Sequence, residues 1–154
     1  MDLSDLIEVS AVMPTLKANS KKQLLQLLAE KAAAVTGLIE REVFDTILQR
    51  ERLGSTGVGN GIAIPHGKLP GVRKITGVFA RLDTPVDFEA LDDQPVDLVF
   101  LLLAPESAGA DHLKALSRIA RVLRDPETVS KIRGSNEAAA IYTFLAQTPA
   151  SHAA

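Results

Sequence analysis

The stretch from Val96 to Leu103 constrains the fold most, because it is apolar at every position except Asp97. A strand with one face in water alternates apolar and polar side chains, whereas a continuous apolar run is typical of a strand covered on both faces. Such a strand needs a packed layer on each side of its sheet. The sequence therefore predicts an α/β protein in which helices enclose a central sheet.

Helical patterns flank this strand in the sequence. Ser20 and Gln23 have the spacing of a capping box, and a broad apolar helical face follows as far as Gly37. A second helix is predicted from Glu40 to about Arg52, ended by Gly54. Three more helices are predicted over residues 111–123, 126–133 and 136–147, the second introduced by Asp125-Pro126.

The remaining strands are shorter or less regular. Val12 to Leu16 is predicted as an edge strand because Pro14 cannot donate a ladder hydrogen bond. Ile62 to Ile64 is predicted as a short buried strand, and Lys74 to Leu82 as an alternating one followed by a polar segment to Pro95. We expect one three-layer α/β/α domain over residues 1–148, after a partly ordered lead-in over residues 1–10, and a disordered tail over 149–154.

Composition excludes several classes of function. The net charge is −2, so no global basic field favours nucleic acid, and the absence of Trp argues against a stacking platform for single strands. The absence of Cys excludes disulfides, thiolate zinc sites and cysteine nucleophiles. The acidic N-terminus is not a signal peptide, and the longest apolar run is far shorter than the roughly 18 residues of a membrane helix. A cytoplasmic protein without membrane insertion is expected.

The segment from Arg50 to Lys68 carries five of the ten glycines. Its glycines do not form a nucleotide loop: Gly61 is one residue too far from Gly67-Lys68 for a Walker A motif, and the spacing of Gly57, Gly59 and Gly61 fails the dinucleotide fingerprint. Glycines alone are also typical of a β-turn. The nearby histidine and arginines favour an anion site instead.

His66 is the leading candidate for chemistry, at the point where a short strand is expected to end in a glycine-flanked turn. A neutral imidazole is a good nucleophile near neutral pH and can form a phosphoramidate. Arg50 and Arg52, in the last turn of a helix, could bind phosphate, and the N–H groups of the glycine loop could form an anion nest. The competing interpretation is an ordinary surface histidine.

His112 is the second candidate, at the start of a helix that follows the central strand, where α/β proteins build sites and where anions are favoured. A divalent metal held by His66, His112 and Asp111 is an alternative, but the spacing matches no metal motif and the arginines oppose a cation. A hydrolase using Ser55 or Thr56 lacks the G-x-S-x-G elbow. His152, in the tail, is expected to have no role.

These residues resemble a known family. The segments Arg50–Gly57 and Gly61–Lys68, with Gln94–Leu98 and His112–Ser117, are similar to the IIA component of the bacterial phosphoenolpyruvate-dependent phosphotransferase system, mannitol/fructose type. Within it, the nitrogen-regulatory branch is the most similar. The resemblance implies a mixed sheet of about five strands between helices, and no metal or organic cofactor.

The resemblance also implies roles for three residues: His66 is phosphorylated, His112 supports the phosphoryl group and Arg50 stabilises it. The donor would be a small histidine phosphocarrier protein, and the phosphorylation state would govern binding to target proteins in nitrogen- or potassium-linked regulation. One alternative is a fructose- or mannitol-transport IIA subunit that passes phosphate to a IIB domain. The other is a passive anion-binding regulatory module.

The regulatory interpretation includes a predicted contact surface for partner proteins around His66. Its basic part is expected to consist of Arg50, Arg52, Lys68 and Arg73. Its apolar part is expected to consist of Leu53, Val58 and Leu69.

Overall fold

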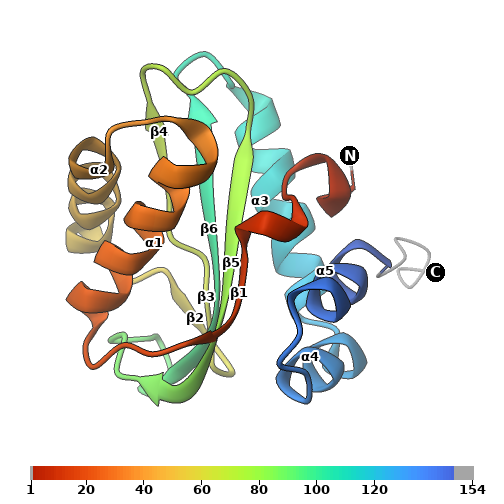
Figure 1. The fold of residues 1–154 in the computed structure, drawn as a ribbon. Coiled ribbons are helices and arrows are strands. Elements are labelled where there is room, and N and C mark those ends of the chain that lie inside the picture. Colours follow the sequence, from red (N-terminus) through yellow and green to blue (C-terminus); the bar gives the residue numbers. More distant parts are fainter. Residues whose placement is uncertain (1, 148–154) are drawn as a thin grey trace.

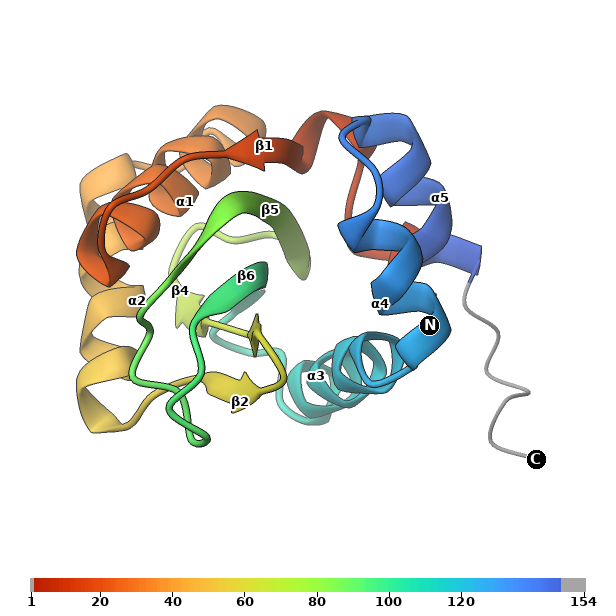
Figure 2. The same ribbon diagram turned by 90° about the horizontal axis from the view of Figure 1, so that it is seen from below.

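The computed structural model describes residues 2–147. Two helices cover one face of a central sheet and three cover the other (Figures 1 and 2), which confirms the three-layer α/β/α architecture. The first pair is α1 (Lys21–Thr36) and α2 (Glu40–Leu53), and the second group is α3 (Ala110–Leu123), α4 (Pro126–Arg133) and α5 (Ala138–Gln147). The predicted tail, including His152, lies outside the described residues.

Helix ends follow the capping signals in the sequence. The Ser20 hydroxyl accepts a hydrogen bond from the Gln23 N–H at 3.1 Å, and α1 ends where Gly37 adopts a left-handed conformation with φ of 79°. The last helix begins two residues later than predicted, at Ala138, because the Ser135 hydroxyl holds the Glu137 N–H in a turn.

The sheet is mixed, as expected, but residues 2–147 contain six strands rather than five. They are β1 (Val12–Leu16), β2 (Gly57–Gly59), β3 (Ile62–Ala63), β4 (His66–Leu69), β5 (Thr76–Val86) and β6 (Val96–Pro105). Their order is β1-β5-β6-β3-β2, with β4 also paired to β6. The prediction missed strands because the glycine-rich segment forms β2, and because the chain after Pro65 extends as β4 instead of turning.

The central strand β6 is covered on both faces, as predicted: residues 98–104 are all buried. It runs parallel to β3 and β4 and antiparallel to β5. The prediction of an alternating β5 was wrong in its first half, where residues 77–80 are all buried because helices lie on both sides. This strand also continues past Leu82 to Val86.

The edge strand β1 and the lead-in before it are both held in place by side chains. β1 pairs only with β5 among the described strands, so it is the predicted edge, and the Pro14 carbonyl accepts from Arg81 Nη1 at 3.1 Å. The lead-in, predicted to be partly ordered, forms two short 3-10 helices, Leu3–Asp5 and Val9–Ala11. The side chains of Leu3, and of Leu6 and Ile7 between the two helices, are buried. Burial of these side chains orders the segment.

Candidate functional site

The first part of the glycine-rich segment is a hairpin. Asn60 and Gly61 connect β2 to β3 with φ values of 57° and 80°, the left-handed backbone of a tight Asn-Gly turn. A Cβ on Gly61 would lie 2.5 Å from Arg133 Nη2, which donates to the Asn60 carbonyl at 2.7 Å. The β-turn interpretation of these glycines is therefore correct. Gly57, Gly59 and Gly61 are not among the residues that line the cleft beside His66.

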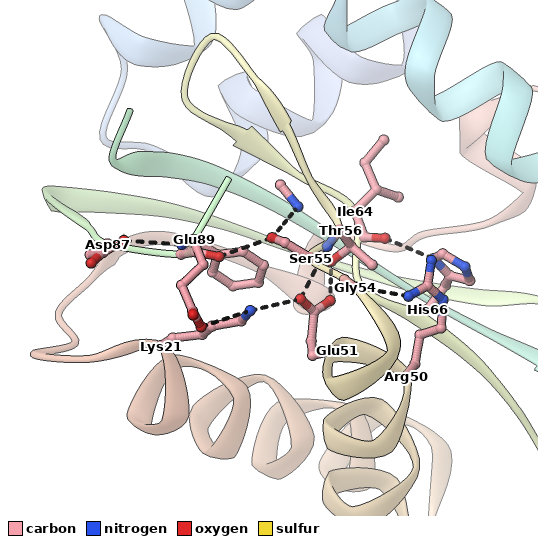
Figure 3. Close-up of polar contacts among 12 residues, drawn as sticks. Lys21, Arg50, Glu51, Gly54, Ser55, Thr56, Ile64, His66, Asp87 and Glu89 are labelled. Carbon is pink, nitrogen blue, oxygen red and sulfur yellow. Dashed lines mark hydrogen bonds and ion pairs between the residues drawn. The ribbon is translucent and has the colours of Figure 1, made fainter. Parts of the chain in front are cut away.

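The second part of the segment presents His66. The Ile64 N–H donates to the Thr56 carbonyl at 3.0 Å, and the Pro65 carbonyl accepts from the Leu102 N–H at 2.9 Å. His66 follows as the first residue of β4, and its Nδ1 lies 2.8 Å from the Ile64 carbonyl (Figure 3). A carbonyl can only accept, so Nδ1 carries the proton. In the neutral ring, Nε2 is then left with a free electron pair.

Helix α2 brings Arg50 to His66 because it packs closely on β4. A Cβ on Gly67 would lie 2.8 Å from Thr46 Cγ2, so glycine permits this approach. Arg50 follows Thr46 by one helical turn on the same face. Its Nη1 donates to the Gly54 carbonyl at 2.9 Å, and its charge is close enough to lower the His66 pKa.

Helix α3 brings His112 to the same place. Gly109, with φ of 55°, precedes the helix, and His112 is buried on the inner face with Ala115 and Ile119. The rings of His66 and His112 meet edge to face, with centroids 5.5 Å apart. The structure thus brings together all three predicted site residues. Within the described chain, Nδ1 of His112 has no hydrogen-bond partner.

Burial lowers the pKa of both imidazoles. It is the largest cause that lowers the pKa of His66, and the charge of Arg50 acts in the same direction, against the Ile64 carbonyl and Glu51. Burial also lowers the pKa of His112, helped by His66 and Lys68. These shifts favour the neutral form of both rings, the state in which an imidazole nitrogen can attack or donate a single N–H.

An open cleft of about 940 Å³ lies over these residues. It contains the basic side chains of Arg50, Arg52 and Lys68, and none of the described residues that line it is acidic. Leu53 and Leu113, 86% and 67% exposed, also line it. The cleft suits an anion bordered by an apolar contact surface.

The predicted contact surface needs correction. Leu69 is only 3% exposed because it points into the core, so it cannot form a contact surface. Val58 and Arg73 line two other hollows, because Val58 belongs to the hairpin and Arg73 follows β4 at its far end. Leu113, which the sequence did not single out, takes their place.

Sequence reasoning also missed Glu51, which is buried. Its carboxylate accepts from the Thr56 N–H at 3.1 Å and from the Thr56 hydroxyl, and it pairs with Lys21 at 3.0 Å (Figure 3). A glutamate between two arginines in a helix's last turn is typical of a solvated surface. The signal available in the sequence was its position five residues before Thr56, whose hydroxyl it binds.

The alternative chemistries gain no support from the geometry. Ser55 donates its hydroxyl to the Phe88 carbonyl at 2.9 Å, so it is not paired with His66 as a hydrolase nucleophile would be. Within residues 2–147 there is no cluster of three His, Cys, Asp or Glu side chains suited to a metal, and Asp111 is exposed. No helix in this part of the chain has the length and apolar character needed to cross a membrane.

Comparison with known proteins identifies the family. Residues 5–148 match the family described as "Phosphoenolpyruvate-dependent sugar phosphotransferase system, EIIA 2". A nitrogen regulatory protein from Bradyrhizobium diazoefficiens is 63% identical over 153 residues, which are 99% of this chain and 100% of the relative. A fructose-specific EIIA component from Haloferax volcanii is 32% identical over 147 residues, which are 95% and 96% of the two chains.

A solved structure agrees with this assignment. The crystal structure of the nitrogen regulatory protein IIA-Ntr from Neisseria meningitidis superposes with a TM-score of 0.88 at 34% identity, covering 93% of this chain and 98% of that one. The resemblance to the nitrogen-regulatory branch is thus confirmed. The chain belongs to the EIIA 2 family of the phosphoenolpyruvate-dependent sugar phosphotransferase system.

Proposed function

We propose that the protein carries a phosphoryl group on Nε2 of His66 and regulates target proteins according to that state. The observation that carries the proposal is the hydrogen bond from His66 Nδ1 to the Ile64 carbonyl, at 2.8 Å. It leaves Nε2 as the unprotonated nitrogen of a ring whose pKa is lowered. His66 lines a cleft together with Arg50, Arg52 and Lys68, and such a basic cleft suits a phosphoryl group.

The phosphoryl donor is a phosphohistidine on a small histidine phosphocarrier protein. The Nε2 electron pair attacks phosphorus, an Nε2–P bond forms, and the donor's N–P bond breaks with its electron pair returning to the donor nitrogen. The proton of His66 stays on Nδ1, where the Ile64 carbonyl accepts it. The step needs no metal or organic cofactor, because the chain's own cations face the cleft.

Arg50 and His112 stabilise the transferred group. The guanidinium of Arg50 can bind two phosphoryl oxygens in its planar fork. His112, whose ring centroid lies 5.5 Å from that of His66, can donate one N–H to a phosphoryl oxygen. The neutral state of His112 leaves its other nitrogen without a proton, so it orients the group and adds no full charge.

Regulation follows from the charge of the cleft. A phosphoryl group adds about −1.5 to −2 charges at neutral pH. Placed among Arg50, Arg52 and Lys68, it offsets much of the positive charge of the surface that an acidic partner would contact. Leu53 and Leu113 supply the apolar contact shared by donor and targets. The names of the more similar relatives support nitrogen-linked targets. We expect the protein to meet these targets in the cytoplasm.

A sugar-transport IIA subunit is the second candidate function. The observation in its favour is the 32% identity to a fructose-specific component. The identity to a nitrogen regulatory protein is higher, at 63%, so the regulatory role ranks first. In that role, His66 would pass its phosphoryl group rapidly to a cysteine of a IIB domain.

Phosphorylation of the purified protein tests the proposal. The wild-type chain, incubated with the phosphorylated histidine phosphocarrier, should gain a phosphate that is acid-labile and alkali-stable, the behaviour of a phosphoramidate. His66→Ala should gain none while keeping its circular dichroism spectrum. Full phosphorylation of His66→Ala would contradict the assignment.

The regulatory role has its own test. Pull-downs with wild type, His66→Ala and His66→Glu should recover partner sets that differ between the neutral and charged variants. Identical partner sets, together with rapid phosphate transfer to a IIB cysteine, would favour the sugar-transport candidate instead.

A further inference from the structure

We propose that Glu51 is a positioning residue for His66: it fixes Thr56, and through it the Ile64 carbonyl that holds the His66 Nδ1 proton. This inference rests on the proposed function of His66. It adds Glu51 and Thr56, to which the proposed function assigns no step of phosphoryl transfer. Figure 3 shows the chain of contacts, from Lys21 through Glu51 and Thr56 to Ile64 and His66.

The first link is between Glu51 and Thr56. Both residues are buried, with 6% and 5% of their surface exposed. One carboxylate oxygen accepts from the Thr56 N–H at 3.1 Å, and the other accepts from the Thr56 hydroxyl. A carboxylate that accepts hydrogen bonds from the backbone and the side chain of one residue fixes the position of both. A buried charge is tolerated only with such partners.

Lys21 completes the environment of Glu51. Its ammonium lies 3.0 Å from the Glu51 carboxylate and 4.6 Å from the centre of the Phe88 ring. Lys21 also pairs with Glu89 at 3.6 Å, but the side chain of Glu89 is 78% exposed, whereas the Thr56 N–H and hydroxyl donate to Glu51. The chain thus offers two carboxylates on one lysine, of which only Glu51 reaches the backbone leading to His66.

The second link is from Thr56 to His66. The Thr56 carbonyl accepts from the Ile64 N–H at 3.0 Å, and the Ile64 carbonyl accepts from His66 Nδ1 at 2.8 Å. Pro65 has no N–H, so the backbone before His66 has one donor fewer than an ordinary strand. Two hydrogen bonds therefore hold the backbone on either side of the Ile64 carbonyl. One joins the Ile64 N–H to Thr56, and the other joins the Leu102 N–H to the Pro65 carbonyl at 2.9 Å.

The consequence is a fixed tautomer. A shift of the Ile64 carbonyl would remove the acceptor from Nδ1–H, and the proton would then distribute between both ring nitrogens. Molecules with a proton on Nε2 have no free electron pair there and cannot attack phosphorus. Glu51 thus controls the fraction of His66 that is ready to react.

Glu51 also acts on His66 through its charge. The groups that face His66 are Arg50 and Glu51 from α2, His112 from α3 and Lys68 from β4, with Arg52 in the same cleft. Glu51 is the one carboxylate among these, and it raises the His66 pKa against the effect of Arg50. Its neutralisation should therefore lower that pKa.

The test uses the full chain labelled with ¹⁵N-histidine, in Glu51→Gln, Thr56→Val, Thr56→Ser and the control Glu89→Gln. The ¹⁵N shifts of His66, followed against pH without any phosphoryl donor, report its tautomer and pKa. Glu51→Gln should show a mixture of tautomers and a lower pKa, and phosphorylation by the phosphocarrier about tenfold slower. Thr56→Val should change the tautomer less, while Thr56→Ser and Glu89→Gln should match wild type.

Folded Glu51→Gln and Thr56→Val proteins with the wild-type tautomer, pKa and phosphorylation rate would overturn the inference. If Glu51→Gln does not fold, the Thr56→Val and Thr56→Ser pair decides it, because a solely structural hydroxyl would alter stability and leave the tautomer unchanged. The tautomer measurement needs no phosphoryl transfer. A wild-type protein that is not phosphorylated would therefore refute the proposed function and still leave the role of Glu51 measurable.

Discussion

Two arginines donate hydrogen bonds to backbone carbonyls of the glycine-rich segment, and their surroundings differ in one respect. Arg133 Nη2 donates to the Asn60 carbonyl at 2.7 Å, and Arg50 Nη1 donates to the Gly54 carbonyl at 2.9 Å. Arg133 also grips the Asp97 carboxylate through Nη2 and Nε, at 2.9 and 3.0 Å. Within the described residues, Arg50 has no carboxylate partner.

This difference separates a structural arginine from one available to a ligand. The charge of Arg133 is neutralised, and its donors close the hairpin against α4. The charge of Arg50 faces a cleft with no acidic residue among those described, so part of its hydrogen-bonding capacity remains for an incoming anion. Both arginines come from helix ends close to glycines, so composition alone does not distinguish them.

Replacement of Arg50 should have the largest effect. Arg50→Ala should slow phosphorylation about 100-fold, the usual cost of losing one preorganised donor to a developing charge. Arg50→Lys should recover only part of the rate, because lysine keeps the charge but loses the planar fork. The rate is measured in single turnover with the phosphocarrier. Unchanged kinetics in a folded Arg50→Ala protein would remove Arg50 from the site.

Replacement of Arg133 should give the opposite result. Arg133→Ala leaves the Asp97 carboxylate and the Asn60 carbonyl without their partner, which should lower the free energy of unfolding by about 1–3 kcal/mol. Urea titration measures this loss. Phosphorylation of the folded fraction should keep the wild-type rate. A stable Arg133→Ala protein with slow phosphorylation would reverse the comparison.

The hairpin should also be sensitive at Gly61. A side chain there meets Arg133 Nη2 at 2.5 Å and requires φ of 80°, so Gly61→Ala should cost about 1–2 kcal/mol of unfolding free energy. Gly134→Ala is the matched control, because its φ is −83° and no atom lies closer than 3.5 Å to the added Cβ. Equal stability of the two variants in urea titration would show that the turn is not constrained.

The smallest effect concerns pH, and it separates the two regions. His66 and His112 have a pKa below the ordinary 6.5, so the unfolded state binds more protons as pH falls below that value. The cleft should therefore lose stability as pH falls from about 6.5 through the lowered values. Asp92, beside the hairpin, has a pKa below 3.8 because the Asn60 N–H donates to it, so its contribution should be lost only below that pH.

Urea titrations across the pH range check this separation. His66→Gln should flatten the loss of unfolding free energy near pH 6, while Asp92→Asn should alter only the acid end. Above about pH 5, ordinary carboxylates do not titrate. If the free energy of unfolding of His66→Gln has the same pH dependence as wild type in that range, the cleft does not depress the His66 pKa.

Much of the fold was predictable because its determinants are local in sequence. The apolar run of β6 required a layer on each face, and Ser20, Gly37, Gly54 and Asp125 marked helix ends through capping chemistry. The edge position of β1 followed from Pro14. The count of strands did not follow, because β2 and β4 are only three and four residues long and their formation depends on pairing with other strands.

The candidate site was predictable in its residues but not in its surroundings. His66, His112 and Arg50 were named from motif spacing and family resemblance, and the structure places them around one cleft. The anion nest stays a prediction, whereas the contact residues Val58, Leu69 and Arg73 were wrong, because which side of a strand or hairpin faces the cleft depends on packing.

The sequence by itself determined the helices and the central strand, and which histidine follows the rigid Ile64-Pro65 pair. Only the tertiary structure decided which arginine is neutralised and which carboxylate is buried beside the histidine. The pairing of Arg133 with Asp97 spans 36 residues, and the link from Lys21 to Glu51 joins separate helices. Local periodicity carries no record of such contacts, since a charged side chain at a helix end has the same pattern in water as in a buried ion pair.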